Sequence, residues 1–521
     1  MNKNQSEQFI SNSKNRFLIT TATVFGTFIS VMDVSVVNVS LPHMRGAFGV
    51  DLSSVTWIAT SYSISQIIMI TMTGWWSTVL GRKNFYLISF LIFTVGSLLS
   101  ATAGSFSEMI IYRTIQGIGG GPLIPISQAI LRETYSSRQQ GIAMGLFGMG
   151  VVLAPAMGPV FGGWLTEEYG WPWVFFINIP FCVIGMILVN IFIVDPPFLK
   201  RGIKKVDWCG ICLLSITLVG LQFVLERGQE EYWFDSELIT MLTIITVLAA
   251  IILVFWELNT MDPIINFRVL KNIPLSIGSL IIFIFGIALF GSTFLMPQLL
   301  QNLFSYSAMD AGLVLLPRGA ILFVMLPTVG FLFNFIGARL LIFSGACFMS
   351  YTFYLLSQLT LEANYWDLAF PLMIMGFGMP CFFVTLSAVS FSTIKPQDTT
   401  AASALYNLSR RIGGNLGYAL LTTLLARDQA FYRIALMGSI SDLNREFWIF
   451  KDQILSIFLQ QQNTYSLLKM HSLKMAENLI SLHSGILSYN SVHFFLGGMF
   501  LLVFPMIIFI PKEKKKNAEK E

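Results

Sequence analysis

Two ionisable side chains stand inside long apolar stretches of this sequence. Asp33 lies in TFISVMDVSVVNVSLP, and Arg113 lies in IIYRTIQGIGGGPLIPI. Charges at membrane depth are expensive, so they mark candidate functional sites. Low-dielectric surroundings disfavour an ionised carboxyl, so Asp33 could accept a proton, attract a cation, or form a structural salt bridge with an arginine. Arg113 could stabilise the deprotonated acid until a proton arrives, or bond to the carbonyls of a bent helix.

Other polar and aromatic side chains in apolar stretches are candidates to line a cavity. Arg318 follows a proline in LPRGA, while Arg410 and Arg411 share a stretch with Asn407. Bonding between helices is an equally good interpretation of these arginines, and packing is the usual role of the uncharged residues. The candidate cavity residues are Asn38, Trp57, Tyr62, Gln116, Asn178, Arg318, Asn407, Arg410 and Arg411.

Several kinds of chemistry have no matching pattern. The run GIGGG at 117–121 resembles a phosphate-binding loop, but no strand precedes it and no Lys-Ser/Thr follows it. Cys209 and Cys212 form a C-x-x-C without nearby histidines, so we interpret them as packing thiols. The sequence therefore predicts no enzyme, no metal site and no cofactor. Any energy for transport should come from an ion gradient rather than from ATP.

A segment rich in small residues follows Arg113 after a short polar turn. It reads GIAMGLFGMGVVLAPAMGPVFGGW. Small residues let helix backbones approach closely, and prolines bend helices. The pattern predicts a bent, closely packed helix that moves against its neighbours. Its motif residues are Gly145, Ala154, Gly158, Pro159, Gly162 and Gly163.

The composition predicts a polytopic membrane protein. The 521 residues are 55% hydrophobic and only 12% charged, whereas a soluble domain carries about 25% charged residues. The net charge of +4 comes from scattered short segments, which argues against nucleic-acid binding. We predict fourteen membrane-spanning helices near 17–41, 55–77, 85–104, 107–130, 141–164, 173–194, 208–226, 237–258, 273–297, 310–334, 338–358, 367–391, 400–425 and 490–510.

The positive residues predict the orientation. With both termini inside, twenty lysines and arginines fall in inner segments and only two in short outer loops. The segment 426–489 is then outside, and we expect it to form an extracytoplasmic helical hairpin. It could be a lid on the membrane surface or a docking surface for an accessory protein.

A tight basic turn occurs twice, and this repetition predicts two homologous bundles. The first turn contains Gly74, Thr78, Gly81, Arg82 and Lys83, which are candidates for gating at the inner side. The second is the GFLFNFIGAR stretch at 330–339. We expect an all-α fold of two six-helix bundles plus two inserted helices. Its parts are a cytoplasmic tail at 1–16, a first bundle at 17–194, a linker and inserted helix pair at 195–272, a second bundle at 273–510 and a basic cytoplasmic tail at 511–521.

These stretches resemble the major facilitator superfamily, and within it the fourteen-span drug:proton antiporters of the EmrB/QacA type. MDVSVVNVSLP is similar to the first-helix signature, YRTIQGIGGG to the fourth-helix motif, and GLFGMGVVLAPAMGPVFGG to the antiporter motif, with Ala154 in place of a glycine. WPWVFFINIP, DPIINFRVLKN and AASALYNLSRRIGGNLG resemble further signatures. GWWSTVLGRKN departs from the inner-turn motif at Thr78, where the family usually has Asp. This departure puts in doubt a charge network that normally holds one conformation.

The resemblance implies the major facilitator fold and a multi-pass protein of the bacterial cytoplasmic (inner) membrane. It implies proton-coupled multidrug efflux of amphipathic, often cationic, compounds, in which Arg113 takes part in proton coupling. A periplasmic adaptor protein and an outer-membrane channel are implied partners where the host has two membranes. The alternatives are a physiological exporter of fatty acids or a metabolite, and a non-transporting membrane sensor or scaffold.

Overall fold

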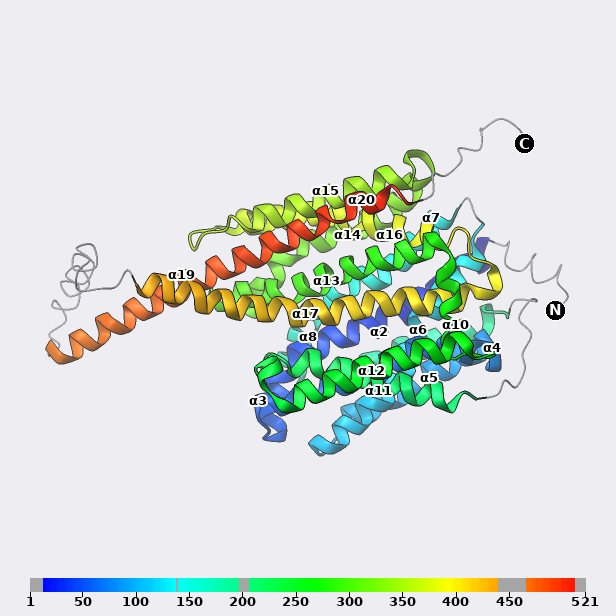
Figure 1. Ribbon diagram of the computed structural model, residues 1–521, viewed down its shortest axis with the longest axis horizontal. Helices are drawn as coiled ribbons and strands as arrows, with labels where there is room; N and C mark the ends of the chain where they lie inside the picture. The colour runs from blue at the N-terminus through cyan, green and yellow to red at the C-terminus, as the bar shows by residue number, and fades with distance from the viewer. Residues whose placement is uncertain (1–12, 137–138, 196–205, 439–464, 511–521) are drawn as a thin grey trace.

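Nearly all of the chain is helical. The computed structural model describes residues 13–136, 139–195, 206–438 and 465–510. All the secondary-structure elements assigned among these residues are helices. The tails predicted at 1–16 and 511–521, the basic linker KRGIKK and the middle of the predicted outer hairpin lie wholly or mostly outside these residues. Helices run along the long axis of the molecule, and the start of α2 (Ser13–Phe48), in dark blue, lies at the same end as α20 (Val503–Ile507), in red (Figure 1). We call this end the termini end and the opposite end the far end.

The first group of helices is the N-half. It consists of α2 (Ser13–Phe48), α3 (Leu52–Val55), α4 (Trp57–Leu80), α5 (Arg82–Ala101), α6 (Phe106–Thr134), α7 (Gln140–Gly148), η2 (Met149–Leu153), α8 (Ala154–Tyr169), α9 (Trp173–Phe176) and α10 (Asn178–Phe192). The π-helical turn η2 joins α7 to α8, and the chain bends there by 41°. Pro155 and Pro159 follow this turn, and prolines and π-turns are common causes of helix bends. The bend predicted from the sequence is present.

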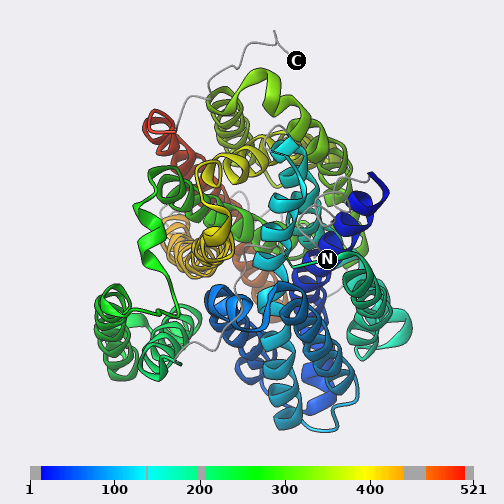
Figure 2. The same ribbon diagram turned by 90° about the vertical axis from the view of Figure 1, so that its right-hand side faces the viewer.

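The second group is the C-half. It consists of α13 (Ile273–Asn302), α14 (Ala308–Ile336), α15 (Ala338–Leu356), α16 (Tyr365–Ser390), η5 (Pro396–Asp398), α17 (Thr399–Met437), α19 (Tyr465–Leu501) and α20 (Val503–Ile507). Between the halves come α11 (Trp208–Arg227), η3 (Trp233–Asp235), α12 (Glu237–Asn259) and η4 (Phe267–Lys271). Helices α11 and α12 pack on each other and stand apart from the two groups in Figure 2. Helix α11 contacts α4 and α17, one from each half.

Ten described helices are long and apolar enough to cross a membrane, and the bent pair around η2 adds an eleventh. Helices α4, α6 and α17 do not meet this criterion, so the expected fourteen spans are not all identified by it. The reason is visible in their side chains. Helix α4 buries eight polar ones, and α6 and α17 bury arginines. These helices face the protein interior, so their mean hydropathy is low.

Two helical arms occupy the described parts of the predicted outer hairpin. Its arms are continuations of α17 and α19, which extend past the other helices at the far end (Figure 1). Arg433 and Glu477 join the two arms by an ion pair of 2.9 Å. Long apolar stretches are found only in the part of a helix that crosses the membrane. A span predicted from hydropathy is therefore shorter than a helix that continues beyond the membrane.

The repeated basic turn has the same backbone geometry in each half. Gly81 separates α4 from α5 with φ 83° and ψ 154°, and Gly337 separates α14 from α15 with φ 86° and ψ 153°. Positive φ is unfavourable for residues with a Cβ atom, so glycine suits both turns. Arg82 directly follows Gly81, whereas Arg339 lies two residues after Gly337, at the position equivalent to Lys83.

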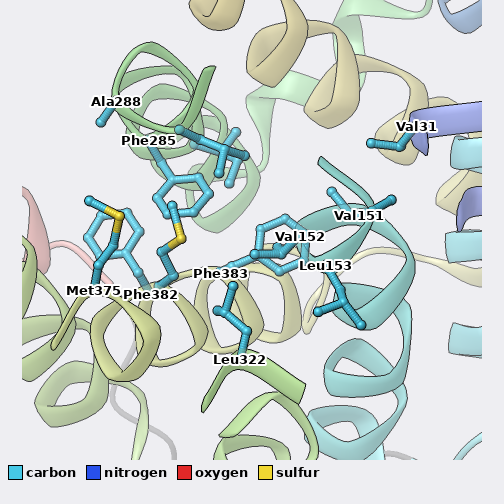
Figure 3. Close-up of a cluster of buried hydrophobic side chains, with 14 of the residues drawn as sticks. Val31, Val151, Val152, Leu153, Phe285, Ala288, Leu322, Met375, Phe382 and Phe383 are labelled. Carbon is cyan, nitrogen blue, oxygen red and sulfur yellow. The ribbon is translucent and has the colours of Figure 1, made fainter. Parts of the chain in front are cut away.

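The two halves meet over an apolar core and at two very close backbone contacts. Val151, Val152 and Leu153 of η2 lie beside Phe383 of α16 in this core (Figure 3). Nearer the termini end, a Cβ atom on Gly141 of α7 would lie only 2.3 Å from the Gly330 carbonyl oxygen of α14. A Cβ atom on Gly74 of α4 would lie 3.3 Å from the Ala401 Cβ of α17.

The contact between α4 and α17 can be tested by cross-linking. The Cβ atoms of disulfides are typically about 3.5–4.5 Å apart, so we expect the double variant Gly74→Cys/Ala401→Cys, in a cysteine-free background, to form a disulfide with a mild oxidant. The linked protein would be detected by mass spectrometry of its proteolytic fragments. Either single variant serves as the control. Failure of the pair to react would show that these halves do not approach in the state described.

Candidate functional site

Asp33 and Arg113 form a buried ion pair inside the N-half. The Arg113 Nη1 atom donates to Asp33 Oδ2 at 2.7 Å, and both side chains are at most 1% exposed. The other carboxylate oxygen, Oδ1, accepts from Gln116 Nε2 at 2.8 Å and from Asn178 Nδ2 at 2.9 Å. The carboxylate belongs to α2, and its hydrogen-bond donors come from α6 and α10.

The guanidinium of Arg113 has partners on every side. Its Nε donates to the Ile58 carbonyl oxygen at 3.1 Å, and its Nη1 also donates to Gln116 Oε1 at 2.6 Å. Its carbon lies 4.2 Å from the centre of the Tyr62 ring and 5.5 Å from that of Phe175. Buried charges are stable only when they are paired and hydrogen-bonded, and this pair meets both conditions.

A chain of hydrogen bonds leads from the ion pair toward the middle of the molecule. The hydroxyl of Tyr62, whose ring lies under Arg113, donates to the Ser30 carbonyl oxygen at 3.2 Å. Gln66 Nε2 donates to that same hydroxyl and to Ser30 Oγ, both at 3.1 Å. Ser30 and Gln66 also line the central cavity. The buried charges are thus connected to the cavity wall through Tyr62, Gln66 and Ser30.

The central cavity lies between the halves and has a volume of about 640 Å³. Its walls come from α2, α4, α6 and α8 of the N-half, α13, α14 and α17 of the C-half, and the inserted helix α11. His43, Glu167 and Gln301 line it and are exposed at the far end. The lining residues of α17 begin only at Arg410, eleven residues into that helix. The cavity therefore opens at the far end and stops near mid-molecule.

The predicted cavity residues fall into two sets. Asn38, Arg410 and Arg411 line the cavity. The others lie elsewhere: Tyr62, Gln116 and Asn178 surround the Asp33–Arg113 pair, Trp57 packs near Phe223 and Arg227, Arg318 donates to the Met375 sulfur at 3.7 Å, and Asn407 bonds to Gln128. Asp33 itself does not line the cavity, because its side chain points into the N-half.

Among the polar cavity residues that were not predicted, three come from α11 and α17, which the sequence alone does not show to be neighbours. Gln222 and Glu226 of α11 line the cavity with Asn415 of α17. Glu226 accepts hydrogen bonds from Thr60 and Gln222, and Asn415 donates to Gln222. Glu226 lies in the last turn of α11, which ends at Arg227. The signal available was its spacing of four from Gln222, which places both on one face of an apolar helix.

The termini end of the interface is closed by polar bonds between the halves. Gln128 Oε1 of α6 accepts from Ser403 Oγ at 2.5 Å and from Asn407 Nδ2 at 2.7 Å. Arg132 Nη2 donates to the Ile394 carbonyl oxygen at 3.1 Å. Together with the contacts at Gly74 and Gly141, these bonds separate the cavity from the termini end.

The basic turn after α4 also contacts the C-half. Arg82 forms an ion pair with Glu133 of α6 and donates to the Pro396 carbonyl oxygen at 3.4 Å. Lys83 bonds to α10 and to Asp195 just after it, and Thr78 donates only to its own helix, at the Trp75 carbonyl oxygen. The Arg82 charge is therefore neutralised by Glu133, although position 78 carries no acid.

The small residues after Arg113 allow close packing against two helices, α14 and α2. A Cβ atom on Gly145 would lie 2.5 Å from the Leu326 carbonyl oxygen of α14, in the C-half. Gly158 and Gly162 pack against Ser35 and Val36 of α2. Pro159 and Gly163 line the cavity, and Ala154 is fully buried at the start of α8. One bent helix thus touches α2, α14 and the cavity.

Known proteins resemble this chain along most of its length. Residues 23–418 match the profile of the Major Facilitator Superfamily. "Multidrug export protein EmrB" of Escherichia coli (strain K12) is 32% identical over 499 residues, 94% of this chain and 94% of that protein. "Fatty acid resistance protein FarB" of Neisseria gonorrhoeae is 29% identical over 418 residues, 80% of this chain and 82% of that protein. These matches confirm the resemblance predicted from the motifs.

The fold has a solved counterpart. The crystal structure of the human organic anion transporter MFSD10 (TETRAN) superimposes with a TM-score of 0.63 at 16% sequence identity, covering 95% of this chain and 100% of that one. At this identity the likeness concerns the fold alone. It agrees with the all-helical architecture of two helix groups around a central cavity.

The buried ion pair predicts non-additive effects on stability. Removing one partner of a buried pair typically costs about 3–5 kcal/mol, because the other charge is left uncompensated. We expect Asp33→Asn and Arg113→Gln each to lower the thermal unfolding temperature in detergent, and the double variant to lose less than both effects added together. The exposed pair Arg433→Gln/Glu477→Gln is the control, for which we expect about 0–1 kcal/mol. Additive losses at Asp33 and Arg113 would contradict the pairing.

Proposed function

Because the chain belongs to the Major Facilitator Superfamily, whose members are transporters and not enzymes, we propose that it is a proton-coupled exporter of amphipathic compounds. The observation that carries the proposal is the Asp33–Arg113 pair. It is buried, hydrogen-bonded by neighbouring side chains and connected to a cavity between the two halves. We place the protein in the bacterial cytoplasmic membrane, in keeping with its bacterial relatives.

We propose fourteen spans with both termini in the cytoplasm. Helices α4, α6 and α17 join the other eleven because they are 24, 29 and 39 residues long and pack among them. About 20 residues suffice for an apolar helix to span a bilayer. The positive residues of the short segments set the orientation. The termini end is then cytoplasmic, and the cavity faces outward.

Transport would proceed by alternating access of the cavity to the two sides. In the inward-facing state, the bonds of Gln128 with Ser403 and Asn407 would break, and the contact of Gly141 with Gly330 would open. The bent helix α7–α8 touches both α2 and α14, so it is placed to carry this movement. The cavity would close at the far end as it opens at the termini end.

Protonation of Asp33 would couple this movement to the proton gradient. A neutral carboxyl no longer attracts the Arg113 guanidinium as an ion, so the arginine shifts toward its remaining partners. Tyr62 lies against that guanidinium and is bonded to Ser30 and Gln66 at the cavity wall. A shift of Arg113 would therefore move side chains at the cavity wall. A substrate that moves those side chains would in turn change the surroundings of Asp33. This reciprocity is what exchange of a proton for a substrate requires.

The name of the Escherichia coli relative supports multidrug export. We propose that the substrates are amphipathic compounds, including cations, because the carboxyl groups of Glu226 and Glu167 line the cavity. If the host has two membranes, a periplasmic adaptor protein and an outer-membrane channel would complete the export route. The far-end arms of α17 and α19 would be their docking surface, and a lid on the membrane surface is the alternative role. No nucleic acid takes part.

A second candidate is a physiological exporter of fatty acids or a metabolite. The observation in its favour is the pair of arginines, Arg410 and Arg411, in the cavity wall. The name of the Neisseria gonorrhoeae relative points in the same direction. A non-transporting sensor or scaffold would instead give no gradient-dependent flux of any compound.

We expect Asp33→Asn to abolish proton-driven efflux while leaving the protein in the membrane. Energised cells loaded with ethidium, with and without a protonophore, provide the measurement, normalised to the amount of protein in the membrane. Wild type should extrude the dye only while the gradient persists. The surface variant Asp235→Asn is the control and should behave as wild type, because this side chain is exposed. Normal efflux by Asp33→Asn would remove Asp33 from the mechanism.

A further inference from the structure

Two adjacent arginines of α17 line the central cavity and have unused donors. Arg410 is 3% exposed and Arg411 is 9% exposed. Arg410 Nη2 donates to Asn407 Oδ1 at 3.3 Å, but its Nε and Nη1 atoms have no partner. Arg411 Nη2 donates to Ser63 Oγ of α4 at 3.0 Å, and its Nε atom has no partner. Three buried N–H groups therefore remain available at the cavity wall.

No carboxylate in the described part of the chain forms an ion pair with either arginine. Glu226, which lines the same cavity, instead accepts from Thr60 and Gln222. Buried charges are normally paired, and unsatisfied buried donors carry a desolvation cost. This contrasts with Arg113, whose charge is matched by Asp33. Glu226 is close enough to Arg411 to interact with it electrostatically, but among the described residues no carboxylate bonds directly to either cavity arginine.

The arginines are held in fixed positions. A Cβ atom on Gly286 of α13 would lie 2.4 Å from the Arg410 carbonyl oxygen, and one on Gly413 would lie 2.2 Å from the Phe283 carbonyl oxygen. The backbones of α13 and α17 therefore touch beside the pair. The Arg411 guanidinium carbon also lies 5.6 Å from the centre of the Phe290 ring. A preorganised guanidinium is well suited to bind the oxygens of a carboxylate or phosphate.

Part of the cavity wall fits an apolar tail. Val31, Val34, Ile70, Ile124 and Leu315 line it together with the arginines. Apolar walls with few polar groups that fix orientation are the usual form of a small-molecule site. An amphipath with one tail and an anionic head would place the head at Arg410 and Arg411 and bury the tail against these side chains.

We propose that Arg410 and Arg411 form a binding site for the anionic head of single-tailed amphipaths, and that such compounds are substrates of this cavity. The inference rests on the proposed export function and names its substrate class. It also gives α17 a specific role, because Arg411 reaches Ser63 in the N-half while facing the cavity. An anion bound there would contact both halves through this arginine.

The test compares three probes with the same tail: decanoate, decyltrimethylammonium and decanol. Their binding to the purified full-length protein in a neutral maltoside detergent is measured by calorimetry. We expect decanoate to bind most tightly and to lose affinity at least about ten-fold in Arg410→Gln and in Arg411→Gln, since hydrogen bonds to charged groups are lost. Arg433→Gln, an exposed arginine of the same helix, is the matched control and should bind decanoate as wild type does.

Opposite outcomes would overturn the proposal. Tighter binding of decyltrimethylammonium than of decanoate, with both glutamine variants unchanged, would show that the site is not an anion site. Gradient-driven ethidium efflux would be unaffected by that result, so the proposed function would stand. Should a glutamine variant not fold, Arg411→Lys keeps the charge without the planar fork. We expect it to weaken decanoate binding and not decyltrimethylammonium binding; no change in either would contradict the assignment.

A membrane lipid could supply the same head-group chemistry, and a competition distinguishes the two sources. Decanoate binding is repeated in nanodiscs of phosphatidylglycerol and of phosphatidylcholine. Equal affinity in both supports a free amphipath as the ligand. Strong inhibition by phosphatidylglycerol alone, abolished in Arg410→Gln, assigns the anion site to a lipid phosphate and overturns the proposed substrate.

Discussion

The rest of the arrangement depends on the need to neutralise one carboxylate in the interior of an apolar helix bundle. Asp33 is tied to Arg113 and held by Gln116 and Asn178, so three helices of the N-half share one charge cluster. The charge of Arg113 neutralises the Asp33 carboxylate and so stabilises the site. The site is also sensitive to protonation, because a single proton on Asp33 removes the ion pair. The packing of Tyr62 against the guanidinium connects this sensitivity to the cavity wall.

The interface between the halves is closed at one end and open at the other. At the termini end, glycine contacts and the bonds of Gln128 bring the halves together. At the far end, the halves are separated by a cavity with polar groups from both sides and from α11. Few of these contacts are strong alone, and most can be exchanged for contacts with water. Such an interface can have two stable arrangements, as alternating access requires.

The sequence predicted more of the fold than of the site. Apolar stretches predicted most of the helices, and the isolated charges singled out Asp33 and Arg113, which form the buried ion pair. They could not show which side of each helix faces the cavity, because rotation about a helix axis is decided by packing with neighbours far away in sequence. Gln116 and Asn178 were therefore expected in the cavity but bond to Asp33. Glu226 was not among the predicted cavity residues, because it lies at the end of α11, beyond the most apolar part of that helix.

The central claim is that Asp33 exchanges a proton as substrate binds, and proton release measures this most directly. Purified protein in weakly buffered solution is mixed with ethidium or with decanoate while a pH indicator is followed across a range of pH. The account predicts that wild type releases protons on binding and that Asp33→Asn binds the same ligand without releasing them. Equal proton release from both proteins would place the exchanged proton on another group and contradict the account.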